Sequence, residues 1–350
     1  MMRKIGVLTS GGDAPGMNAA VMSIARSAAA YGMPLIGIKH GYNGLLRKST
    51  SIKDDLQELY LDTVLDIADQ PGTYLRTARC EEFKDPKWRE IAVQTLKAME
   101  IDGLVVIGGD GSFQGAMRLC ELGIPCIGIP GTIDNDLAYT EMTLGYETAV
   151  QVCTEAIRAI RATSRSHDRP HVVECMGRHC GDIALRTCAS TGAEICIVPE
   201  VHWSIQEVAD RLSRLIDNGN PRATVVVAEG AWDSMHPFDW QHFLTERGVK
   251  HVYPDTPINS EYLALILKHK CRAEARATVL GYTQRGRHPS AYDSWFAFEA
   301  GTLAVNLLRN GIGNQVIGIK DGRVFYMPID MALQQKREFD LALYNLVNEL

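Results

Sequence analysis

The chain has 350 residues, of which 46% are hydrophobic, and it carries a formal net charge of −6. A chain of this size can bury a large core in one domain or in two of ordinary size. The charge excludes long-range attraction to nucleic acid or to an anionic membrane, so any phosphate binding must be local. No apolar run approaches the roughly 20 residues that cross a bilayer.

The first residues, "MMRKIGVLTSGGD", lead directly into a predicted strand, without the apolar segment and cleavage site of a secretory signal. We therefore expect a cytoplasmic protein. The nine cysteines form no CxxC pair and several lie in apolar segments such as "IPCIGIP". This pattern favours reduced thiols in the core over disulfides or a metal site.

Short apolar runs alternate with helical patterns in the first half of the chain. The pattern predicts a strand at 4–10, a helix at 15–32, a strand at 101–109, a helix at 112–123 and a strand at 125–131. The residues of the first helix that can share one face are Met17, Ala20, Ile24 and Ala28. Strand and helix in alternation predict an α/β fold with parallel sheets.

The second half repeats this alternation. Strands are predicted at 171–176, 194–200 and 223–230, and Ser204 and Glu207 have the spacing of a capping box at the start of a helix. An earlier helix is predicted from the apolar positions Ala149, Val152, Cys153, Ala156, Ile157 and Ile160. Whether "HPFDWQHFLTERG" forms a further helix is left open. We predict two doubly wound, Rossmann-like lobes that share segments late in the chain.

Two glycine turns have the same construction. In "LTSGGDAPGMNAA" and "VVIGGDGSFQGAM" a buried strand ends in Gly-Gly-Asp and a helix begins within a few residues. Such a turn gathers backbone amides and the positive end of a helix at the carboxyl edge of a sheet, which suits phosphate. The alternative is a tight turn whose glycines serve backbone geometry alone. Neither turn has the P-loop or GxGxxG pattern.

Acidic residues accompany these turns. Asp110 would repel phosphates unless a divalent cation such as Mg²⁺ lies between them. In "GIPGTIDND", Asp134 and Asp136 are two apart, so in an extended segment both would face the crevice. One can then accept a proton while the other orients it or the metal. A solvated turn of acidic residues is the alternative for this segment.

Five segments together resemble the bacterial ATP-dependent 6-phosphofructokinase family: "GVLTSGGDAPGMNAA", "VVIGGDGS", "PGTIDND", "MGRHCGD" and "ARATVLGYTQRG". They occur in order over most of the chain, whereas "GGDG" alone would also suit lipid and NAD kinases. The resemblance implies transfer of the ATP γ-phosphoryl group to O1 of fructose 6-phosphate, the committed step of glycolysis. It also implies an active site in the cleft between the lobes.

The resemblance implies a role for each matching residue. The nucleotide contacts would be Gly12, Tyr42, Arg79, Cys80, Gly109, Asp110, Gly111 and Ser112, with Asp110 on Mg²⁺. Thr132, Asp134, Asp136 and Arg178 would surround the transferring group, with Asp134 as the general base. The sugar phosphate would contact Thr132, Ile133, Asp134, Arg169, Met176, Gly177, Arg178, Glu229, Arg276, Tyr282 and Arg285.

The resemblance also implies how the chain is divided and assembled. Residues 1–145 and 284–334 would form the ATP-binding lobe, and residues 146–283 and 335–350 the lobe that binds fructose 6-phosphate. In the family, the arginines that match Arg169 and Arg276 reach a neighbouring subunit of a homotetramer. The expected partners are therefore the two substrates and further copies of the chain.

Some positions bear on the choice of substrate. Members that use pyrophosphate have a bulkier acid at Gly111 and a lysine at Gly131, so two glycines imply ATP as the donor. The family usually has histidine at Tyr282 and glycine at Arg287, and Arg287 brings a bulky cation near the sugar-phosphate pocket. The segment between Glu229 and Arg276 is longer than in short bacterial members.

The effector site of regulated bacterial members is depleted here. Its approximate equivalents that are not cations are Met22, Leu61, Asn218 and Asn220, while Arg26, Arg161, Arg222 and Glu194 remain. Each lost guanidinium removes a phosphate contact of roughly 1.5–3 kcal/mol. We expect weak or absent control by ADP or phosphoenolpyruvate.

Three alternatives remain open at this point. One is a related kinase that acts on another sugar phosphate or on NAD, and one is the use of pyrophosphate as donor. The third is a non-catalytic regulatory subunit, which would have lost an acid or an arginine from the reacting centre. Asp110, Asp134, Asp136 and Arg178 are all present.

Overall fold

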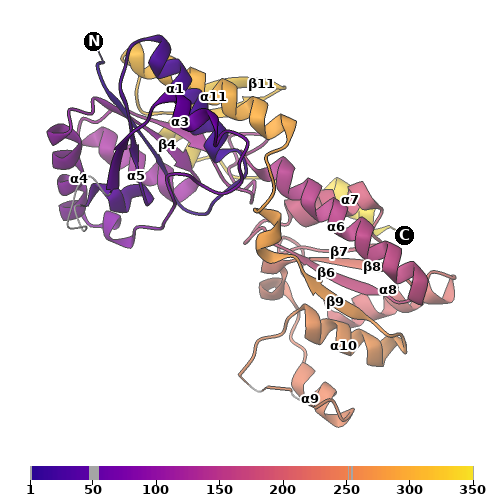
Figure 1. Ribbon diagram of the computed structural model, residues 1–350. Coiled ribbons are helices and arrows are strands. Elements are labelled where there is room, and N and C mark those ends of the chain that lie inside the picture. The colour runs from indigo at the N-terminus through magenta and orange to yellow at the C-terminus, as the bar shows by residue number, and fades with distance from the viewer. Residues whose placement is uncertain (1, 47–54, 251, 254, 350) are drawn as a thin grey trace. The chain divides into compact units, whose positions relative to one another are not determined.

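The structure, a computed structural model, describes residues 2–46, 55–250, 252, 253 and 255–349 (Figure 1). The chain divides into two compact units. Unit 1 comprises Met1–Thr148 and Arg285–Glu338, and unit 2 comprises Ala149–Gln284 and Phe339–Leu350. The boundaries expected from the sequence, 145/146, 283/284 and 334/335, fall a few residues before these. Which substrate each unit binds stays a prediction.

Unit 1 is built on a seven-stranded sheet of order β11-β10-β5-β4-β1-β2-β3. Its strands are β1 (Ile5–Thr9), β2 (Leu35–Ile38), β3 (Leu56–Glu58), β4 (Gly103–Gly108), β5 (Cys126–Pro130), β10 (Gln315–Lys320) and β11 (Arg323–Pro328). The five inner strands run parallel, and β3 and β11 pair antiparallel at the two edges.

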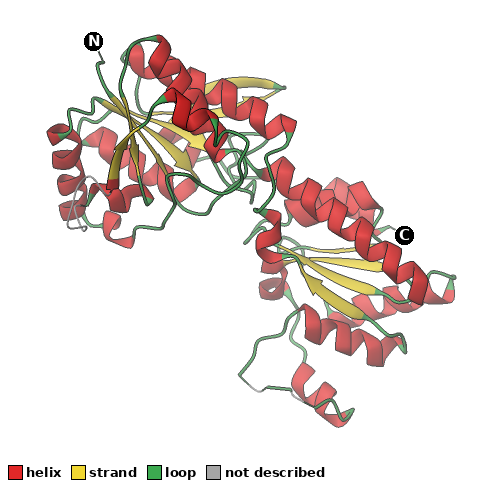
Figure 2. Cartoon of the chain, viewed as in Figure 1, coloured by secondary structure: helices red, strands yellow, loops and turns green. Residues whose placement is uncertain are grey.

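Helices cover both faces of this sheet (Figures 1 and 2). The α-helices are α1 (Met17–Ala30), α3 (Leu61–Leu65), α4 (Pro86–Ala98), α5 (Asp110–Glu121), α11 (Ala291–Arg309) and α12 (Ile329–Leu333), with short 3₁₀ helices η1 (Gly41–Leu45) and η2 (Glu81–Lys84). Helix α1 packs against α11 on one face, and α4, α5 and α12 cover the other. The doubly wound arrangement predicted from the sequence is confirmed for this unit.

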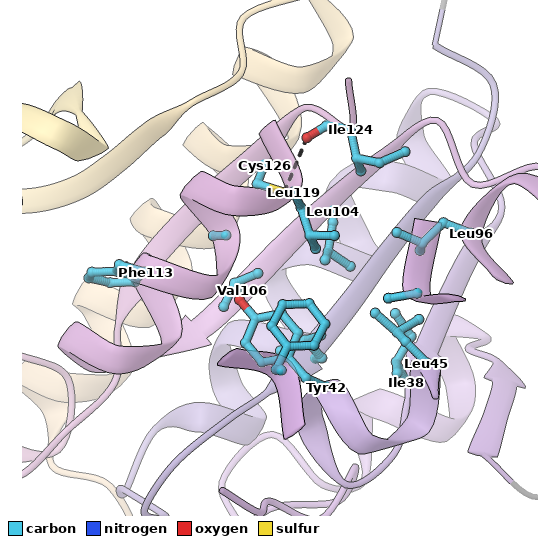
Figure 3. Packing of buried hydrophobic residues seen from close by; sticks show 14 of the residues in the cluster. Ile38, Tyr42, Leu45, Leu96, Leu104, Val106, Phe113, Leu119, Ile124 and Cys126 are labelled. Atoms are coloured by element: carbon cyan, nitrogen blue, oxygen red, sulfur yellow. Dashed lines mark hydrogen bonds between the residues drawn. The ribbon is translucent and has the colours of Figure 1, made fainter. Parts of the chain in front are cut away.

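Apolar residues of the strands and helices meet in the core of unit 1. Figure 3 shows Phe113 and Leu119 of α5 and Val106 of β4 in this core, with Tyr42 beside them. The four residues expected to share one face of α1, from Met17 to Ala28, are all fully buried. The periodicity of the sequence therefore identified the buried face of this helix correctly.

Unit 2 has a smaller sheet of order β7-β8-β6-β9, and all its neighbouring strands are parallel. Its elements are α6 (Tyr146–His167), β6 (His171–Cys175), α7 (Asp182–Thr191), β7 (Ile195–Ile197), α8 (Ile205–Asp217), β8 (Thr224–Ala228), η3 (Glu229–Ser234), α9 (Trp240–Glu246), α10 (Ser260–Cys271), β9 (Arg276–Val279), η4 (Gly281–Gln284) and α13 (Leu341–Asn348). The first residues of α6, up to Thr148, belong to unit 1. Helices α8 and α10 lie on one face, and α6 and α7 on the other (Figure 1).

Helices α8 and α9 of unit 2 begin with side-chain caps. The capping box is present, with the Ser204 hydroxyl accepting from the Glu207 amide and the Glu207 carboxylate accepting from the Ser204 amide. The segment left open forms α9, which Asp239 caps by accepting from the amide of His242 at 3.0 Å. Among the described residues, no helix has both the length and the apolar character needed to cross a membrane.

Candidate active site

The first glycine turn follows β1 in unit 1. Gly11 and Gly16 have φ angles of 93° and 94°, which L side chains rarely adopt. The turn is tied to the segment 76–80, because the Gly11 amide donates to Ala78 O at 3.4 Å and the Thr77 hydroxyl donates to Gly11 O at 3.0 Å. This places Arg79, which is exposed, and Cys80 next to the turn, as a shared ligand would require.

The second glycine turn joins β4 to α5 and lies directly beside the first. The Ser112 hydroxyl donates to Ser10 O at 3.3 Å across the two turns. A Cβ at Gly108 would lie 2.5 Å from Ser112 Oγ and 2.6 Å from Ser10 O, so only glycine lets the turns approach this closely. A Cβ at Gly111, in contrast, would meet no atom within 4 Å. The backbone at Gly111 therefore faces open space, where a ligand can approach it.

Asp110 is the first residue of α5 and its side chain is exposed. One of its carboxylate oxygens accepts from Gln114 Nε2 at 2.6 Å. The described residues contain no group of three or more His, Cys, Asp or Glu side chains that could hold a metal ion by themselves. A single carboxylate at the start of a helix instead fits a cation that is shared with bound phosphates.

The third turn follows β5 and contacts the second. The Gly131 amide donates to Gly108 O at 3.0 Å, and a Cβ at Gly109 would lie 3.9 Å from Thr132 Cβ. A Cβ at Gly131 itself would lie 2.8 Å from Met17 Cε and 2.9 Å from Ile107 Cγ2. Three strand ends that are adjacent in the sheet thus bring their turns together into one continuous surface of backbone.

The two acids after the third turn differ in their surroundings. Asp134 is 5% exposed and its amide donates to Thr132 Oγ1 at 3.2 Å, whereas Asp136 is exposed. The extended conformation considered for this segment is not found. The chain bends here, because Asn135 has a left-handed φ of 52° and its amide group bonds to Glu141 O and the Thr143 amide.

Tyr42 was expected to contact a nucleotide, but the structure places it in the core. It is 3% exposed, its ring stacks on Phe83 at 4.1 Å, and its hydroxyl donates to Ser112 O at 2.6 Å. Burial raises the pKa of this hydroxyl well above its usual value. Because the ring also lies against Gly115, Tyr42 supports the first turn of α5 rather than offering a free surface to a ligand.

In unit 2 the structure brings together residues that the sequence placed at the sugar. Glu229 Oε1 accepts from the amides of Gly177 and Arg178 at 3.2 and 2.8 Å, and Gln284 Oε1 accepts from the Met176 amide at 2.8 Å. Gly177 and Arg178 both have positive φ angles, and a Cβ at Gly230 would overlap Arg178 O. Glu229 therefore shapes the turn from Met176 to Arg178.

Arg169 and Arg276 lie near one another at the edge of the unit 2 sheet. The Arg276 amide donates to Pro170 O at 3.2 Å, and its side chain is 55% exposed, 3.5 Å from Glu274. The pKa of Glu274 is lowered mainly by Lys268, and further by Arg276 and Arg169. Tyr282, on the short 3₁₀ helix after β9, is 79% exposed. The edge strand β9 thus begins with an exposed arginine that is paired with Glu274.

Arg285 belongs to unit 1, where its Nη1 lies 3.2 Å from Asp13 Oδ1. A Cβ at Gly12 would come within 3.0 Å of the same nitrogen. The structure therefore places Arg285 against the first glycine turn, next to a predicted nucleotide contact. Its contact with the sugar phosphate stays a prediction.

Three of the four charged residues that remain of the depleted effector cluster, Arg161, Arg222 and Glu194, are bonded within unit 2, whereas Arg26 lies in unit 1, 5.4 Å from the centre of the Phe298 ring. Arg161 bonds to Thr191 O and lies 3.0 Å from Glu194, which also accepts from Asn220 Nδ2 at 2.9 Å and from the Thr224 amide at 2.8 Å. Arg222 pairs with Asp168 at 3.2 Å. These groups join neighbouring segments of the unit.

Asp293, a 1% exposed acid in the first turn of α11, lies outside all the motifs that the sequence indicated. Burial raises its pKa to about 6, against the opposing effect of hydrogen bonds from Thr148 and Gly145. The signal was present in "SAYD", where Ser290 and Asp293 have the spacing of a helix start.

Comparison with known proteins decides the family. The sequence profile described as Phosphofructokinase matches residues 4–308. The chain belongs to the phosphofructokinase family. Relatives of this phosphofructokinase chain from Alkaliphilus metalliredigens and Clostridioides difficile, both named ATP-dependent 6-phosphofructokinase, are 43% and 45% identical to it. Each alignment of 349 residues covers 100% of this chain and 99% of the relative.

Solved phosphofructokinases share the fold. The Pichia pastoris phosphofructokinase in the T-state matches with a TM-score of 0.82 and 33% identity over 95% of this chain, which spans only 35% of that longer chain. The pyrophosphate-dependent phosphofructokinase from Marinobacter aquaeolei matches with a TM-score of 0.81 over 97% of this chain and 86% of its own. At 20% identity it supports the fold alone.

The geometry of the second turn predicts that alanine at Gly108 and alanine at Gly111 change the free energy of unfolding differently. Gly108→Ala should lower the free energy of unfolding by about 1–3 kcal/mol, because its Cβ overlaps Ser10 O. Gly111→Ala, the matched control, should leave it unchanged or raise it by up to about 1 kcal/mol, since the new methyl group lies in a helix and in open space. Urea unfolding measures both, and equal losses would contradict the packing described.

Proposed function

We propose that the chain is an ATP-dependent 6-phosphofructokinase of the cytoplasm. It transfers the γ-phosphoryl group of ATP to O1 of fructose 6-phosphate and yields fructose 1,6-bisphosphate and ADP, in glycolysis. The observation that carries the proposal is the surface formed by three adjoining turns, which holds one exposed and one buried acid. The names of relatives that match over the full chain support the same reaction.

The glycine turns would hold the nucleotide. The proposed contacts are Gly12, Arg79, Cys80, Gly109, Asp110, Gly111 and Ser112, and Tyr42 supports them from the core. Asp110 is the residue that would contact Mg²⁺, whose charge offsets that of the phosphates when it is bound. Backbone amides at the start of α5 would meet phosphate oxygens that a side chain at Gly111 would keep away.

Asp134 is proposed as the general base. In the reaction its carboxylate takes the proton from the O1 hydroxyl of the sugar as O1 forms a bond to the γ-phosphorus, and the bond to the β,γ-bridging oxygen breaks with release of ADP. Thr132 and Asp136 flank this residue, and Arg178 would neutralise charge on the transferring group. Burial of Asp134 limits its hydration, which suits a base that must meet a hydroxyl directly.

The sugar would lie at the carboxyl end of β6 in unit 2, whereas Arg169 and Arg276 lie at the amino end of β6 and β9. Met176, Gly177 and Arg178 would line the sugar, with Glu229 setting the shape of this turn and meeting the hydroxyls. Planar guanidinium groups grip phosphate through two hydrogen bonds, which is the role proposed for Arg169, Arg276 and Arg285. Ile133 and Tyr282 complete the proposed set.

Replacing the proposed base should change the rate of phosphoryl transfer but not the affinity for ATP. Asp134→Asn should lower kcat by roughly 10²–10⁴-fold, because general base catalysis is worth that much, and should leave ATP affinity nearly unchanged. Steady-state kinetics and equilibrium dialysis measure the two quantities. Asp102 lies just before β4 and accepts from the amides of Arg3 and Lys4, so Asp102→Asn removes a carboxylate far from the turns and should leave kcat unchanged. A near wild-type kcat in Asp134→Asn would refute the assignment.

The prediction of the donor rests on Gly111, where a Cβ would meet open space, and on Gly131, which is packed against Met17 and Ile107. With no side chain at Gly111 or Gly131, kcat/KM should favour ATP over pyrophosphate. Introducing an acid by Gly111→Asp should preserve the fold, because its Cβ meets open space, and should raise the KM for ATP. Coupled assays with each donor test this, and a preference of the unmodified chain for pyrophosphate would overturn it.

We propose a homotetramer in which Arg169 and Arg276 complete the site of a neighbouring subunit. The exposed edge strand β9 and its half-exposed Arg276 support this proposal. Asp134→Asn and Arg276→Ala should each be nearly inactive alone. Mixed tetramers should regain activity, because some sites then combine an intact acid with an intact arginine. Sedimentation checks the assembly, and mixed tetramers without regained activity would contradict the shared site.

A further inference from the structure

Asp293 connects two helices that are far apart in the sequence. Ser290 caps α11 by accepting from the Asp293 amide at 3.1 Å. The Asp293 carboxylate reaches the start of α6, where it accepts from the Gly145 amide at 2.7 Å, the Thr148 amide at 2.9 Å and the Thr148 hydroxyl at 2.5 Å. Thr148 Oγ1 in turn accepts from the Ser290 amide at 2.9 Å. The two helix starts are thus joined through one buried carboxylate.

The junction presents hydrogen-bond donors to Asp293, and they oppose the larger effect of burial on its pKa. Both α6 and α11 also present the positive end of a helix to Asp293, where a negative charge is favourable. A carboxylate offers acceptors only, so both of its oxygens can serve the three donors of α6. An amide in its place would turn one NH₂ group toward those donors. The interaction therefore depends on charge as well as on shape.

The residues just before α6 form hydrogen bonds to the segment that contains the proposed base. Leu144 donates its amide to Pro130 O at 2.7 Å, and the Thr143 hydroxyl donates to Thr132 O at 2.6 Å. The Thr143 amide donates to Asn135 Oδ1 at 3.0 Å. Asp134 is therefore held on both sides by a segment that Asp293 fixes at its far end.

The same junction contacts the first glycine turn. A Cβ at Gly16 would lie 2.7 Å from Leu144 Cδ1 and 3.6 Å from Asp293 Cβ, and a Cβ at Gly145 would lie 2.7 Å from Ala14 Cβ. The turn proposed for the nucleotide and the segment proposed for the base thus meet at Asp293. A displacement there would change the distance between the two.

We propose that Asp293 is a positioning residue for phosphoryl transfer, which holds the segment around Asp134 in register with the glycine turns. The proposal rests on the function proposed above. Asp293 is not proposed to touch a substrate, since its carboxylate is buried and bonded to Gly145 and Thr148. It acts through Thr143 and Leu144 on the orientation of the base.

The test compares Asp293→Asn with Asp102→Asn in the full chain. Each variant removes a carboxylate that accepts backbone amides within unit 1, but Asp102 lies at the opposite end of β4 from the turns. Asp293→Asn should lower kcat by about 100-fold, the effect expected when reacting groups are misplaced by about 1 Å, with little change in the KM for ATP. Asp102→Asn should match the wild type in both quantities.

A second variant decides the matter should Asp293→Asn fail to fold. Thr148→Val keeps the branched shape but removes the hydroxyl that donates to Asp293, and it should lower kcat by about tenfold, the effect expected from one charge-assisted bond. Asp293→Glu, which keeps the charge, should recover part of the loss of Asp293→Asn. A folded Asp293→Asn with wild-type kcat, or Thr148→Val with wild-type kcat, would overturn the proposal.

Hydrogen–deuterium exchange of backbone amides tests the positioning role without measuring enzymatic activity. Deuterium uptake over residues 130–148 should be faster in Asp293→Asn than in Asp102→Asn, whichever substrate the enzyme uses. An inactive wild type with this difference would refute the proposed reaction and leave the positioning role supported. Equal uptake in the two variants would refute the positioning role even if fructose 6-phosphate is the substrate.

Discussion

The parallel pairing of β1, β4 and β5 is the constraint on which the proposed site depends. Thr9 pairs with Ile107, and Gly108 pairs with Pro130, so the three strands end at the same level. The chain places β2 and β3 on one side of β1 and then β4 and β5 on its other side, so the strand order reverses between β1 and β4. Ligands of open α/β sheets bind at such points. Small residues in the turns then permit backbone contact between neighbours, which larger side chains would prevent.

The same arrangement gives two acids different chemistry. Asp110 opens α5 and faces solvent, where an ionised carboxylate can share a cation with phosphates. Asp134 follows the next strand and is buried by the bend at Asn135, whose left-handed backbone is fixed through its side chain. One acid suits metal binding and the other suits proton transfer, and neither role follows from residue type alone.

Much of this could be predicted because it depends on local pattern. The strands before the glycine turns, the buried face of α1 and the capping box at Ser204 follow from periodicity and capping chemistry, which short segments specify. The hairpin of β10 and β11 was missed, although Asp321 and Gly322 have the positive φ angles of a two-residue turn. An Asp-Gly pair between apolar runs was the available signal.

Other features depend on contacts between distant segments, which a single sequence does not reveal. Tyr42 is buried because Phe83 and α5 cover it, and Arg285 meets Asp13 only after the chain returns to unit 1. Asp293 resembles an ordinary helix-start acid until Gly145 and Thr148 are placed beside it. In each case the residue type suggested a polar role, and tertiary packing decided which partner it has.

A crystal structure of the complex with Mg²⁺, a non-hydrolysable ATP analogue and fructose 6-phosphate tests the central claim most directly. The account predicts phosphates on the backbone of Gly109 to Gly111, the cation in contact with Asp110, and an Asp134 oxygen about 2.6–3.2 Å from O1 of the sugar. A nucleotide bound away from these turns, or an Asp134 carboxylate directed away from O1 in a closed complex, would contradict it.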